Sequence, residues 1–468
     1  MVAFGKTLEG IPTTIPGMTL YQLPVHGDSR GWFKENWQHE KMSSIGLPDF
    51  GPVQNNISFN DAVGTTRGIH GEPWDKFVSV ATGKIFGAWV DLREGPSFGT
   101  VFTAELDPSV AIFVPRGVGN SYQTLEPDTA YSYLVNDHWS AGAQSEYTFL
   151  NLADETANIP WPIPLADAEL SEKDQKHPRL ADVAPMPPRK TLILGANGQV
   201  GRALVALLPN ANAVGRAEFD VTDAAAYESF PWKSYDTIIN ATAYTSVDEA
   251  ETDGGRRDAW AVNVAATSLL AATATRHRLT LVHVSTDYVF DGIEELHAED
   301  EPLTPLGVYG QTKAAADAIV ATVPRHYIVR TSWVIGDGAN FVRTMASLAG
   351  RGVAPSVVDD QHGRLSFADD VAAGIIHLTS TGADYGTYNL SNEGPVVTWA
   401  DVARAVFTAT GHDPAYVTGI STAEYFAGRT VAPRPLNSTL DLGKIARAGF
   451  IPRTADEALR DYLAGEQS

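Results

Sequence analysis

The chain has 468 residues, 44% hydrophobic and 19% charged, which suits a soluble protein of two globular domains and excludes a disordered one. Its formal net charge of -22, without any run of basic residues, argues against a general nucleic-acid binder. It contains no cysteine, which excludes disulfides, thiolate metal sites and cysteine nucleophiles.

The N-terminal segment MVAFGKTLEGIPTTIPG lacks the apolar core of a signal peptide. No uninterrupted apolar stretch reaches the roughly 18 residues that a membrane span needs. These observations predict a cytoplasmic protein that does not interact with a membrane.

Residues 19–161 consist of short apolar or alternating runs separated by Gly, Pro, Asn and Asp, a pattern typical of antiparallel strands. A proline-rich segment at 185–189 follows, and after it apolar strands alternate with alanine-rich helical stretches. We therefore predict a first domain over 1–184, a linker over 185–189 and a second domain over 190–468.

In the first domain, TTRGIHGEPWDKFVSV places Arg67, His70 and Lys76 on neighbouring strand positions. Tyr133 in SYLVND and Asp174 in LSEKD complete a candidate set. Taken singly, each also fits a structural role, such as a hydrogen-bonded histidine or a lysine at a strand edge. A metal-binding cupin would need several histidines and a carboxylate, and only His70 lies in this stretch, so we predict no metal.

The first domain contains, in order, the motifs DSRGWF, QNNIS, RGIH, VDLREGPSFG, FVPRGVGNSY, SYLVND, IPWPI and LSEKD. Through these motifs it resembles dTDP-4-dehydrorhamnose 3,5-epimerase over about residues 10–180. The resemblance implies a cupin-like antiparallel β jelly roll that forms a homodimer. It implies His70 as the base, oriented by Asp174, with Lys76 stabilising the enolate and Tyr133 returning a proton. It assigns the nucleotide and its diphosphate to Arg30, Glu35, Gln54, Asn56 and Arg67.

One position departs from that family. Where a second histidine is usual, this chain has Asn120, which can form hydrogen bonds but cannot titrate. The segment between His70 and Lys76 is also shorter than usual. An alternative interpretation is therefore a non-catalytic module that binds substrate or mediates dimerisation.

The second domain opens with the strand TLIL, followed by Gly195, Gly198 and Gly201 at the start of a helix. Glycines at such a turn let the backbone approach a pyrophosphate, which binds at the positive end of the helix dipole. We predict a Rossmann-type parallel sheet. Arg216 follows the second strand, where no acidic residue stands, which favours NADPH and leaves NADH open.

A catalytic set follows in VSTDYVFDG and VYGQTK. Thr286 lies at the end of an apolar strand, and Tyr309 and Lys313 are spaced to share one helix face. A tyrosine with the ordinary pKa of about 10 is a poor proton donor and acceptor at neutral pH. We expect the Lys313 ammonium to lower that pKa and Thr286 to hold a carbonyl oxygen.

These motifs, with LILGANGQVGRAL, INATAYTSVDEAE, VRTSWVIG, VVDDQHGR and APRPLNSTLD, resemble dTDP-4-dehydrorhamnose reductase, an extended short-chain dehydrogenase, over about 190–468. The resemblance implies a small C-terminal substrate lobe and a Thr286, Tyr309 and Lys313 triad. It assigns the cofactor to Gln199, Val200, Asp220, Val221, Ala243 and Tyr244, and the sugar nucleotide to Thr286, Asp287 and Trp333.

The two resemblances name consecutive steps on one molecule. They imply 3,5-epimerisation of dTDP-4-dehydro-6-deoxy-D-glucose and then reduction of its C4 ketone to dTDP-L-rhamnose. The same chemistry on another 4-keto-6-deoxy sugar nucleotide is an alternative. A non-catalytic regulatory protein is a third, and the presence of both Tyr309 and Lys313 counts against it.

Overall fold

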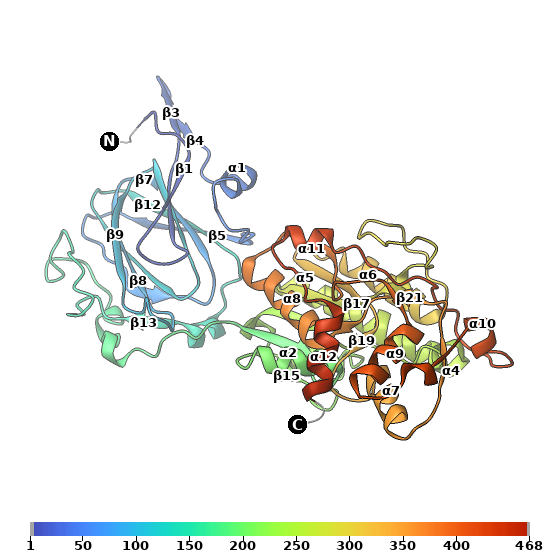
Figure 1. Cartoon of the computed structure of the whole chain (residues 1–468). Coiled ribbons are helices and arrows are strands. Elements are labelled where there is room, and N and C mark those ends of the chain that lie inside the picture. The colour runs from blue at the N-terminus through green and yellow to red at the C-terminus, as the bar shows by residue number, and fades with distance from the viewer. Residues whose placement is uncertain (1–3, 466–468) are drawn as a thin grey trace. The chain divides into compact units, whose positions relative to one another are not determined.

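The computed structural model describes residues 4–465, and the chain divides after Pro188 into two compact units, which we describe separately (Figure 1). Among the described residues, no helix has both the length and the apolar character that crossing a membrane requires.

The first unit contains two antiparallel sheets. The larger sheet has the strand order β1 (Glu9–Pro12), β2 (Thr19–Gln22), β10 (Val110–Val114), β7 (Lys76–Thr82), β12 (Thr129–Val135), β5 (Gln54–Asn60). The smaller sheet has the order β13 (Thr148–Leu150), β6 (Ile69–Gly71), β11 (Val118–Thr124), β8 (Ile85–Asp91), β9 (Val101–Leu106). The predicted cupin-like jelly roll is confirmed.

The two sheets enclose an apolar core to which both contribute. Val78 and Ile112 come from the larger sheet, and Trp89 and Tyr122 come from the smaller one. Strands β8 and β11 are buried along their whole length, so they do not show the alternation of a half-exposed strand. Burying both sheet faces leaves room for polar side chains only where they have partners.

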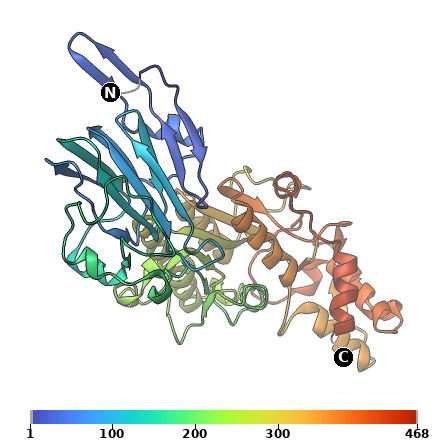
Figure 2. The same ribbon diagram turned by 90° about the vertical axis from the view of Figure 1, so that its left-hand side faces the viewer.

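A hairpin of β3 (Val25–Asp28) and β4 (Gly31–Lys34) extends beyond these stacked strands, followed by the short helix α1 (His39–Ser43) (Figure 2). At the other end of the unit, the proline-rich segment is attached to the sandwich. The amide of Met186 donates to the carbonyl oxygen of Leu92, and its own carbonyl accepts from Glu94.

The second unit is built on six parallel strands. Their order is β15 (Asn212–Val214), β14 (Lys190–Leu194), β16 (Tyr235–Asn240), β17 (Thr280–Thr286), β18 (His326–Thr331), β23 (Gly386–Asn389). This confirms the predicted Rossmann-type sheet. The sequence predicts it correctly because continuous apolar strands alternating with helices require crossover connections.

Helices cover both faces of this sheet. One face packs on α3 (Ala226–Ser229), α5 (Ala266–His277) and α6 (Val308–Val320), and the other on α2 (Gln199–Leu207), α8 (Ala368–Thr381) and α11 (Gly443–Arg447). Helix α4 (Asp253–Trp260) joins α5 through a π-helical segment, Ala261–Ala265.

A separate apolar cluster forms the C-terminal lobe of this unit. Its helices are α7 (Phe341–Gly350), α9 (Trp399–Ala409) and α12 (Ala455–Gly465). Short strand pairs complete the lobe region: β19 (Val334–Ile335) with β22 (Ser366–Phe367), β20 (Ser356–Val358) with β25 (Thr418–Ile420), and β21 (His362–Gly363) with β24 (Val397–Thr398). The remaining short helix is α10 (Thr422–Tyr425).

The carboxyl ends of β14, β16 and β17 meet at one edge of the parallel sheet. They lead directly into Gly195, Ala241 and Asp287. Ligands of open parallel sheets bind in the crevice at this edge. The fold therefore brings together three segments that are widely separated in the sequence.

Candidate active sites

In the first unit, His70 on β6 is paired with Asp174, which lies 104 residues later in a short turn. The Nε2 atom of His70 is 3.2 Å from a carboxylate oxygen of Asp174. Burial alone would raise the pKa of Asp174, but hydrogen bonds from His70 and Ser171 lower that pKa to about 2. The carboxylate therefore stays ionised and accepts a hydrogen bond from Nε2 of His70, which leaves Nδ1 as the ring nitrogen that can take a proton.

Gly68 makes this pairing sterically feasible. A Cβ atom at this position would lie 2.2 Å from Asp174 Oδ1 and 2.7 Å from His70 Nε2. Both distances are far below van der Waals contact, so any side chain would separate the pair. The glycine two residues before His70 is thus part of the site's geometry.

The fold adds His177, which the sequence analysis did not select. Its Nε2 atom lies 3.9 Å from Asp174, and its ring centre is 5.4 Å from that of His70. Burial and the nearby His70 lower the pKa of His177. The ligand atoms of His70, Asp174 and His177 lie within 4.8 Å of one another, so two histidines and a carboxylate do meet at one point.

Lys76 is held by an acidic neighbour that the sequence analysis also missed. Its Nζ is 2.6 Å from Glu72 Oε1; the Lys76 side chain is buried, and that of Glu72 is 11% exposed. The ammonium also lies 5.4 Å from the ring centre of Tyr133. Burial, followed by the charge of Glu72, raises the pKa of Tyr133 to about 12, so its hydroxyl stays protonated at neutral pH.

Asn120 lies directly opposite His70 in the pairing of β11 with β6. Its carbonyl oxygen accepts hydrogen bonds from the Trp89 indole at 2.9 Å and from the Tyr131 hydroxyl at 3.1 Å. Because that oxygen already has two donors, the side chain has only its amide N–H groups to offer a ligand.

The residues assigned to the nucleotide fall into two groups. Asn56 lies opposite Tyr133 on β5 and accepts a hydrogen bond from Gln54 at 2.8 Å, and the charge of Arg67 also acts on Tyr133. Arg30 and Glu35, by contrast, lie at the hairpin, where they pair with Asp28 and Lys41 respectively. The ion pairs of these two residues are thus made within or beside the hairpin.

In the second unit, the glycine turn leaves no room for side chains. Gly195 has a φ of +80°, and a Cβ there would lie 2.8 Å from the backbone of Ala241. A Cβ on Gly201 would lie 2.0 Å from the carbonyl oxygen of Gly195, and Gly198 caps the N-terminus of α2. The turn is therefore tight enough to expose the first N–H groups of the helix to a phosphate.

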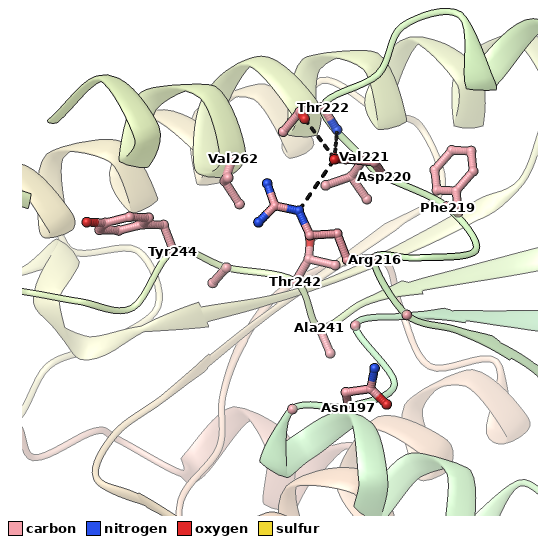
Figure 3. Close-up of a pocket in the computed structure, with 14 residues that line it drawn as sticks. Asn197, Arg216, Phe219, Asp220, Val221, Thr222, Ala241, Thr242, Tyr244 and Val262 are labelled. Atoms are coloured by element: carbon pink, nitrogen blue, oxygen red, sulfur yellow. Dashed lines mark hydrogen bonds and ion pairs between the residues drawn. The ribbon is translucent and has the colours of Figure 1, made fainter. Parts of the chain in front are cut away.

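A cavity of 310 Å³ opens beside this turn (Figure 3). Arg216 projects into it, and its Nε is 3.4 Å from Asp220. Hydrogen bonds from Thr222 and then Arg216 lower the pKa of Asp220. The cavity is lined by seven residues assigned to the cofactor: Gly195, Gly198, Arg216, Asp220, Val221, Ala243 and Tyr244.

A second cavity, of 620 Å³, shares Gly198, Ala241, Thr242 and Ala243 with the first, so the two are contiguous. It gathers the remaining assigned residues except Gly201, namely Gln199, Val200, Thr286, Asp287, Tyr309, Lys313 and Trp333. One continuous space thus connects the glycine turn to the predicted triad.

Thr286 ends β17, and its hydroxyl is 2.9 Å from Asp287. Burial raises the pKa of Asp287 to about 6. Burial, followed by the charge of Asp287, raises the pKa of Tyr309. From the sequence we expected Lys313 to lower the pKa of Tyr309. The pKa of Tyr309 shifts in the opposite direction, because desolvation outweighs other influences on this buried phenol.

Lys313 is itself fully buried, and burial lowers its pKa to about 8. Its Nζ donates to the carbonyl oxygen of Val284 at 2.7 Å and lies 3.0 Å from Nε2 of His283. His283 is a further residue that the sequence analysis did not select. It stands three positions before Thr286. A polar residue inside an otherwise apolar strand is the sequence feature that could have identified it.

Two tryptophans line the far part of the second cavity. Trp333 has a φ of +45°, uncommon for a residue with a side chain, and it stacks on Trp399 with ring centres 3.8 Å apart. Trp399 lies at the start of α9, in the C-terminal lobe. It could not be identified from the sequence because it lies 66 positions after its stacking partner.

Asn263, in the π-helical segment, connects the two parts of the second site. Its side chain accepts from the amide of Tyr244 at 2.8 Å and donates to the Thr312 hydroxyl at 2.9 Å. π-Helical turns are frequent at functional sites. This one links the segment that lines the first cavity to the helix that carries Tyr309.

Comparison with known families divides the chain at the same place. Residues 12–182 match the family model for dTDP-4-dehydrorhamnose 3,5-epimerase, and residues 189–468 match that for the RmlD substrate binding domain. An RmlC homolog of Streptococcus pyogenes is 51% identical over 180 residues, which are 37% of this chain and 90% of that protein.

The second half has relatives of its own. A dTDP-4-dehydrorhamnose reductase of Aggregatibacter actinomycetemcomitans is 38% identical over 298 residues, covering 59% of this chain and 98% of that protein. A crystal structure of the Bacillus anthracis reductase in complex with NADP is 30% identical, with a TM-score of 0.55, and the match covers 60% of this chain and 99% of that one.

Replacing Gly68 with alanine tests the geometry of the His70 and Asp174 pair. The new methyl group must displace Asp174, so we expect a loss of about 1–3 kcal/mol in unfolding free energy, measured by denaturant titration. A crystal structure should show the pair separated. Gly142→Ala is the matched control, because nothing lies within 4 Å of a Cβ at that position. Unchanged stability together with an intact pair would contradict our account of Gly68.

Proposed function

Because the chain belongs to the dTDP-4-dehydrorhamnose 3,5-epimerase family in its first half and to the RmlD reductase family in its second, we propose that it is a bifunctional enzyme of dTDP-L-rhamnose synthesis. The first unit would epimerise dTDP-4-dehydro-6-deoxy-D-glucose at C3 and C5. The second would reduce the C4 ketone. Two observations support this proposal: Thr286, Tyr309 and Lys313 line one cavity of the second unit, and in the first unit His70 pairs with Asp174 while Lys76 lies over the ring of Tyr133.

The first unit performs proton transfer without redox change. Nδ1 of His70 takes the proton from the carbon next to the ketone, and the electron pair of the broken C–H bond moves into an enolate. The ammonium of Lys76 stabilises the enolate oxygen. Tyr133, protonated because its pKa is about 12, returns a proton to the opposite face of the carbon and inverts it. The cycle occurs once at C3 and once at C5.

Glu72 explains how a buried ammonium is available for this step. Its carboxylate is 2.6 Å from Lys76 and also accepts from the Trp74 indole at 2.5 Å. A charged group removed from water needs a partner of opposite charge. Glu72 thus holds and orients Lys76 before any substrate binds.

We propose that this site works without a metal, although His70, Asp174 and His177 converge. A nitrogen that binds a metal carries no hydrogen, whereas Nε2 of His70 donates its hydrogen to Asp174. Metal binding would compete with the pairing that orients the base.

The second unit fits a dinucleotide phosphate. Gly195 and Gly201 leave the turn free of side chains, and α2 begins there with open N–H groups. Arg216 projects into the adjoining cavity, where a guanidinium would bind a 2'-phosphate. When bound, NADPH supplies the hydride. The glycine turn would hold the pyrophosphate, and the contiguous cavity would hold the sugar nucleotide.

The chain's own groups then manage the proton. Thr286 and Tyr309 donate hydrogen bonds to the C4 carbonyl oxygen, and the raised pKa of Tyr309 keeps the phenol protonated until a more strongly basic alkoxide forms at C4. As the hydride is transferred to C4, the π electron pair of the carbonyl moves to its oxygen. This oxygen takes the hydroxyl proton of Tyr309, which gives an alcohol and a tyrosinate. Lys313 restores the tyrosine proton. Asp287 and Trp333 are assigned to the sugar nucleotide.

We also propose a homodimer formed through the first unit. Strand β5 is an edge of the larger sheet, and it exposes Ile57 by 68% and Phe59 by 56%. Exposed apolar side chains on an edge strand favour pairing with another copy. In such a dimer, the hairpin that carries Arg30 would be free to contribute Arg30 and the adjacent Glu35 to the partner's site.

Two other functions are alternatives to this proposal. The first unit would be a binding module alone if Asn120 had removed catalysis, and the same chemistry on another 4-keto-6-deoxy sugar nucleotide would use the same groups. As a biosynthetic enzyme that uses NADPH and nucleotide sugars, the protein is assigned by this proposal to the cytoplasm.

Two single substitutions separate the proposed activities. Tyr309→Phe should lower NADPH oxidation with the keto sugar nucleotide by about 10²- to 10⁴-fold, while exchange of solvent deuterium into C3 and C5 continues. His70→Asn should stop that exchange and preserve reduction of a pre-epimerised substrate. Each variant is the control for the other. Full NADPH oxidation in Tyr309→Phe, or full exchange in His70→Asn, would refute the corresponding assignment.

A chelator tests the proposal that the first site uses no metal. Extensive dialysis against EDTA should leave the rate of deuterium exchange unchanged, because the base is activated by Asp174. Excess Zn²⁺ should slow exchange by occupying His70 and Asp174, and His177→Ala should weaken that inhibition. Loss of exchange after chelation, restored by a divalent ion, would contradict the proposal.

The dimer is tested by placing charge on β5. The double variant Ile57→Lys and Phe59→Lys should sediment as a monomer, because two buried ammonium groups would oppose association. Ile293→Lys, at a residue that is 80% exposed in the second unit, is the control. A dimer that persists in the β5 variant would place the interface elsewhere.

A further inference from the structure

His283 is a buried, titratable side chain for which the proposed mechanism has no role. Its Nε2 is 3.0 Å from the amine nitrogen of Lys313, and its Nδ1 is 3.2 Å from the side-chain nitrogen of Asn240. All three side chains are fully buried. Water therefore does not mediate these contacts, and the hydrogen atoms must be arranged among the protein groups themselves.

The orientation of Asn240 is determined by its neighbour. Its carbonyl oxygen accepts from the backbone N–H of Thr242 at 3.1 Å and from the hydroxyl of the same residue at 2.5 Å. A backbone N–H is always a donor, so the amide cannot be turned around. The NH₂ group of Asn240, which only donates, therefore faces His283.

These contacts determine where the hydrogen atoms of His283 and Lys313 lie. Nδ1 of His283 must accept from Asn240, so the single proton of neutral His283 is on Nε2. That proton points at the nitrogen of Lys313. An ammonium has no lone pair, so only the neutral amine can accept it, while Lys313 still donates to the carbonyl oxygen of Val284.

Protonating Lys313 breaks this arrangement. The lysine would then need a lone pair on Nε2, and the histidine proton would move to Nδ1, where it would face the NH₂ group of Asn240. Two buried donors would point at each other, which is unfavourable. The chain of hydrogen bonds from Thr242 to Lys313 therefore favours the amine over the ammonium.

We propose that His283 is a positioning residue of the reductase: through its Nε2–H it stabilises the neutral amine of Lys313 and thereby sets the pH above which Tyr309 is no longer reprotonated. This inference rests on the proposed function, in which Lys313 returns the proton to the tyrosinate. His283 itself touches neither cavity.

Other charges near Lys313 act in different directions. Asp317, one turn along α6, favours the ammonium, but its carboxylate also pairs with Arg330 at 3.0 Å. Tyr309, Asp287 and Tyr288 line the same cavity as Lys313, and Asp287 and Tyr288 both act on the pKa of Tyr309. Burial nevertheless lowers the pKa of Lys313 to about 8, the direction that the hydrogen-bond network reinforces.

The protonation state of Lys313 determines how the rate of reduction depends on pH. Lys313 is an ammonium below its pKa and an amine above it, so reduction should fall as the pH rises through about 8. In His283→Gln, the amide can turn its carbonyl oxygen toward Lys313 and accept from the ammonium. The midpoint of the alkaline fall in kcat should then shift to a pH higher by about one unit or more.

If His283 had only a structural role, its replacement would not shift the alkaline limb of the pH profile of kcat. Loss of packing at residue 283 would lower kcat at every pH and leave the midpoint of the limb unchanged, and this outcome would overturn the proposal. The matched control is His326→Gln, on the neighbouring strand, whose imidazole contacts the carbonyl of Val323. We expect the control to retain the wild-type midpoint.

Asn240→Asp provides a second variant in case His283→Gln does not fold. A carboxylate oxygen in place of the NH₂ group accepts from Nδ1–H of His283, which frees Nε2 to accept from the Lys313 ammonium. This variant should also shift the limb upward. An unchanged or lower midpoint would contradict the proposal.

Direct observation of the tautomer does not depend on activity. In full-length protein labelled with ¹⁵N-histidine, the signal missing from His283→Gln identifies His283. We expect the Nε2–H tautomer in the wild type and the Nδ1–H tautomer in Asn240→Asp. An Nδ1–H tautomer in the wild type would overturn the inference. Absence of NADPH oxidation by the wild type would instead count against the proposed function, and the NMR result would still decide the role of His283.

Discussion

Ionisable side chains that are removed from water need partners within the fold, and both candidate sites are organised by this requirement. In the first unit, Lys76 is paired with Glu72 and Asp174 with His70. In the second, Lys313 is placed against His283. The two pairs of the first unit keep their charged groups oriented before a substrate is present, whereas the contact with His283 biases Lys313 toward the amine. Proton transfer can then proceed without first reorganising the site.

Backbone geometry makes these arrangements possible at positions where no side chain fits. Gly68 lets Asp174 reach His70, and Gly195 and Gly201 let the second unit expose a helix N-terminus to a phosphate. The two folds solve the same problem differently. The β sandwich presents His70 and Lys76 from strands of its two different sheets, whereas the parallel sheet collects its groups at the edge where its strands end.

Joining the two units in one chain links two reactions that use the same ring carbonyl. The first reaction needs the C4 ketone to acidify the protons at C3 and C5, and the second removes that ketone. Reduction therefore makes the epimerisation irreversible. A shared chain also keeps the two sites at a fixed stoichiometry and a high effective concentration for a reactive intermediate.

The sequence by itself determined the order of strands and helices, the glycine turn and the spacing of Tyr309 and Lys313. These features are local: they depend on residues a few positions apart, whose periodicity and turn preferences appear in any stretch of chain. Only the tertiary structure decided which partners the reactive groups have. His177, Glu72, Asn263, His283 and Trp399 acquire their roles from contacts across strands and between distant segments. The pKa of Tyr309 likewise moves opposite to the expectation, because desolvation is set by how the whole unit packs around the phenol, and no local pattern encodes that.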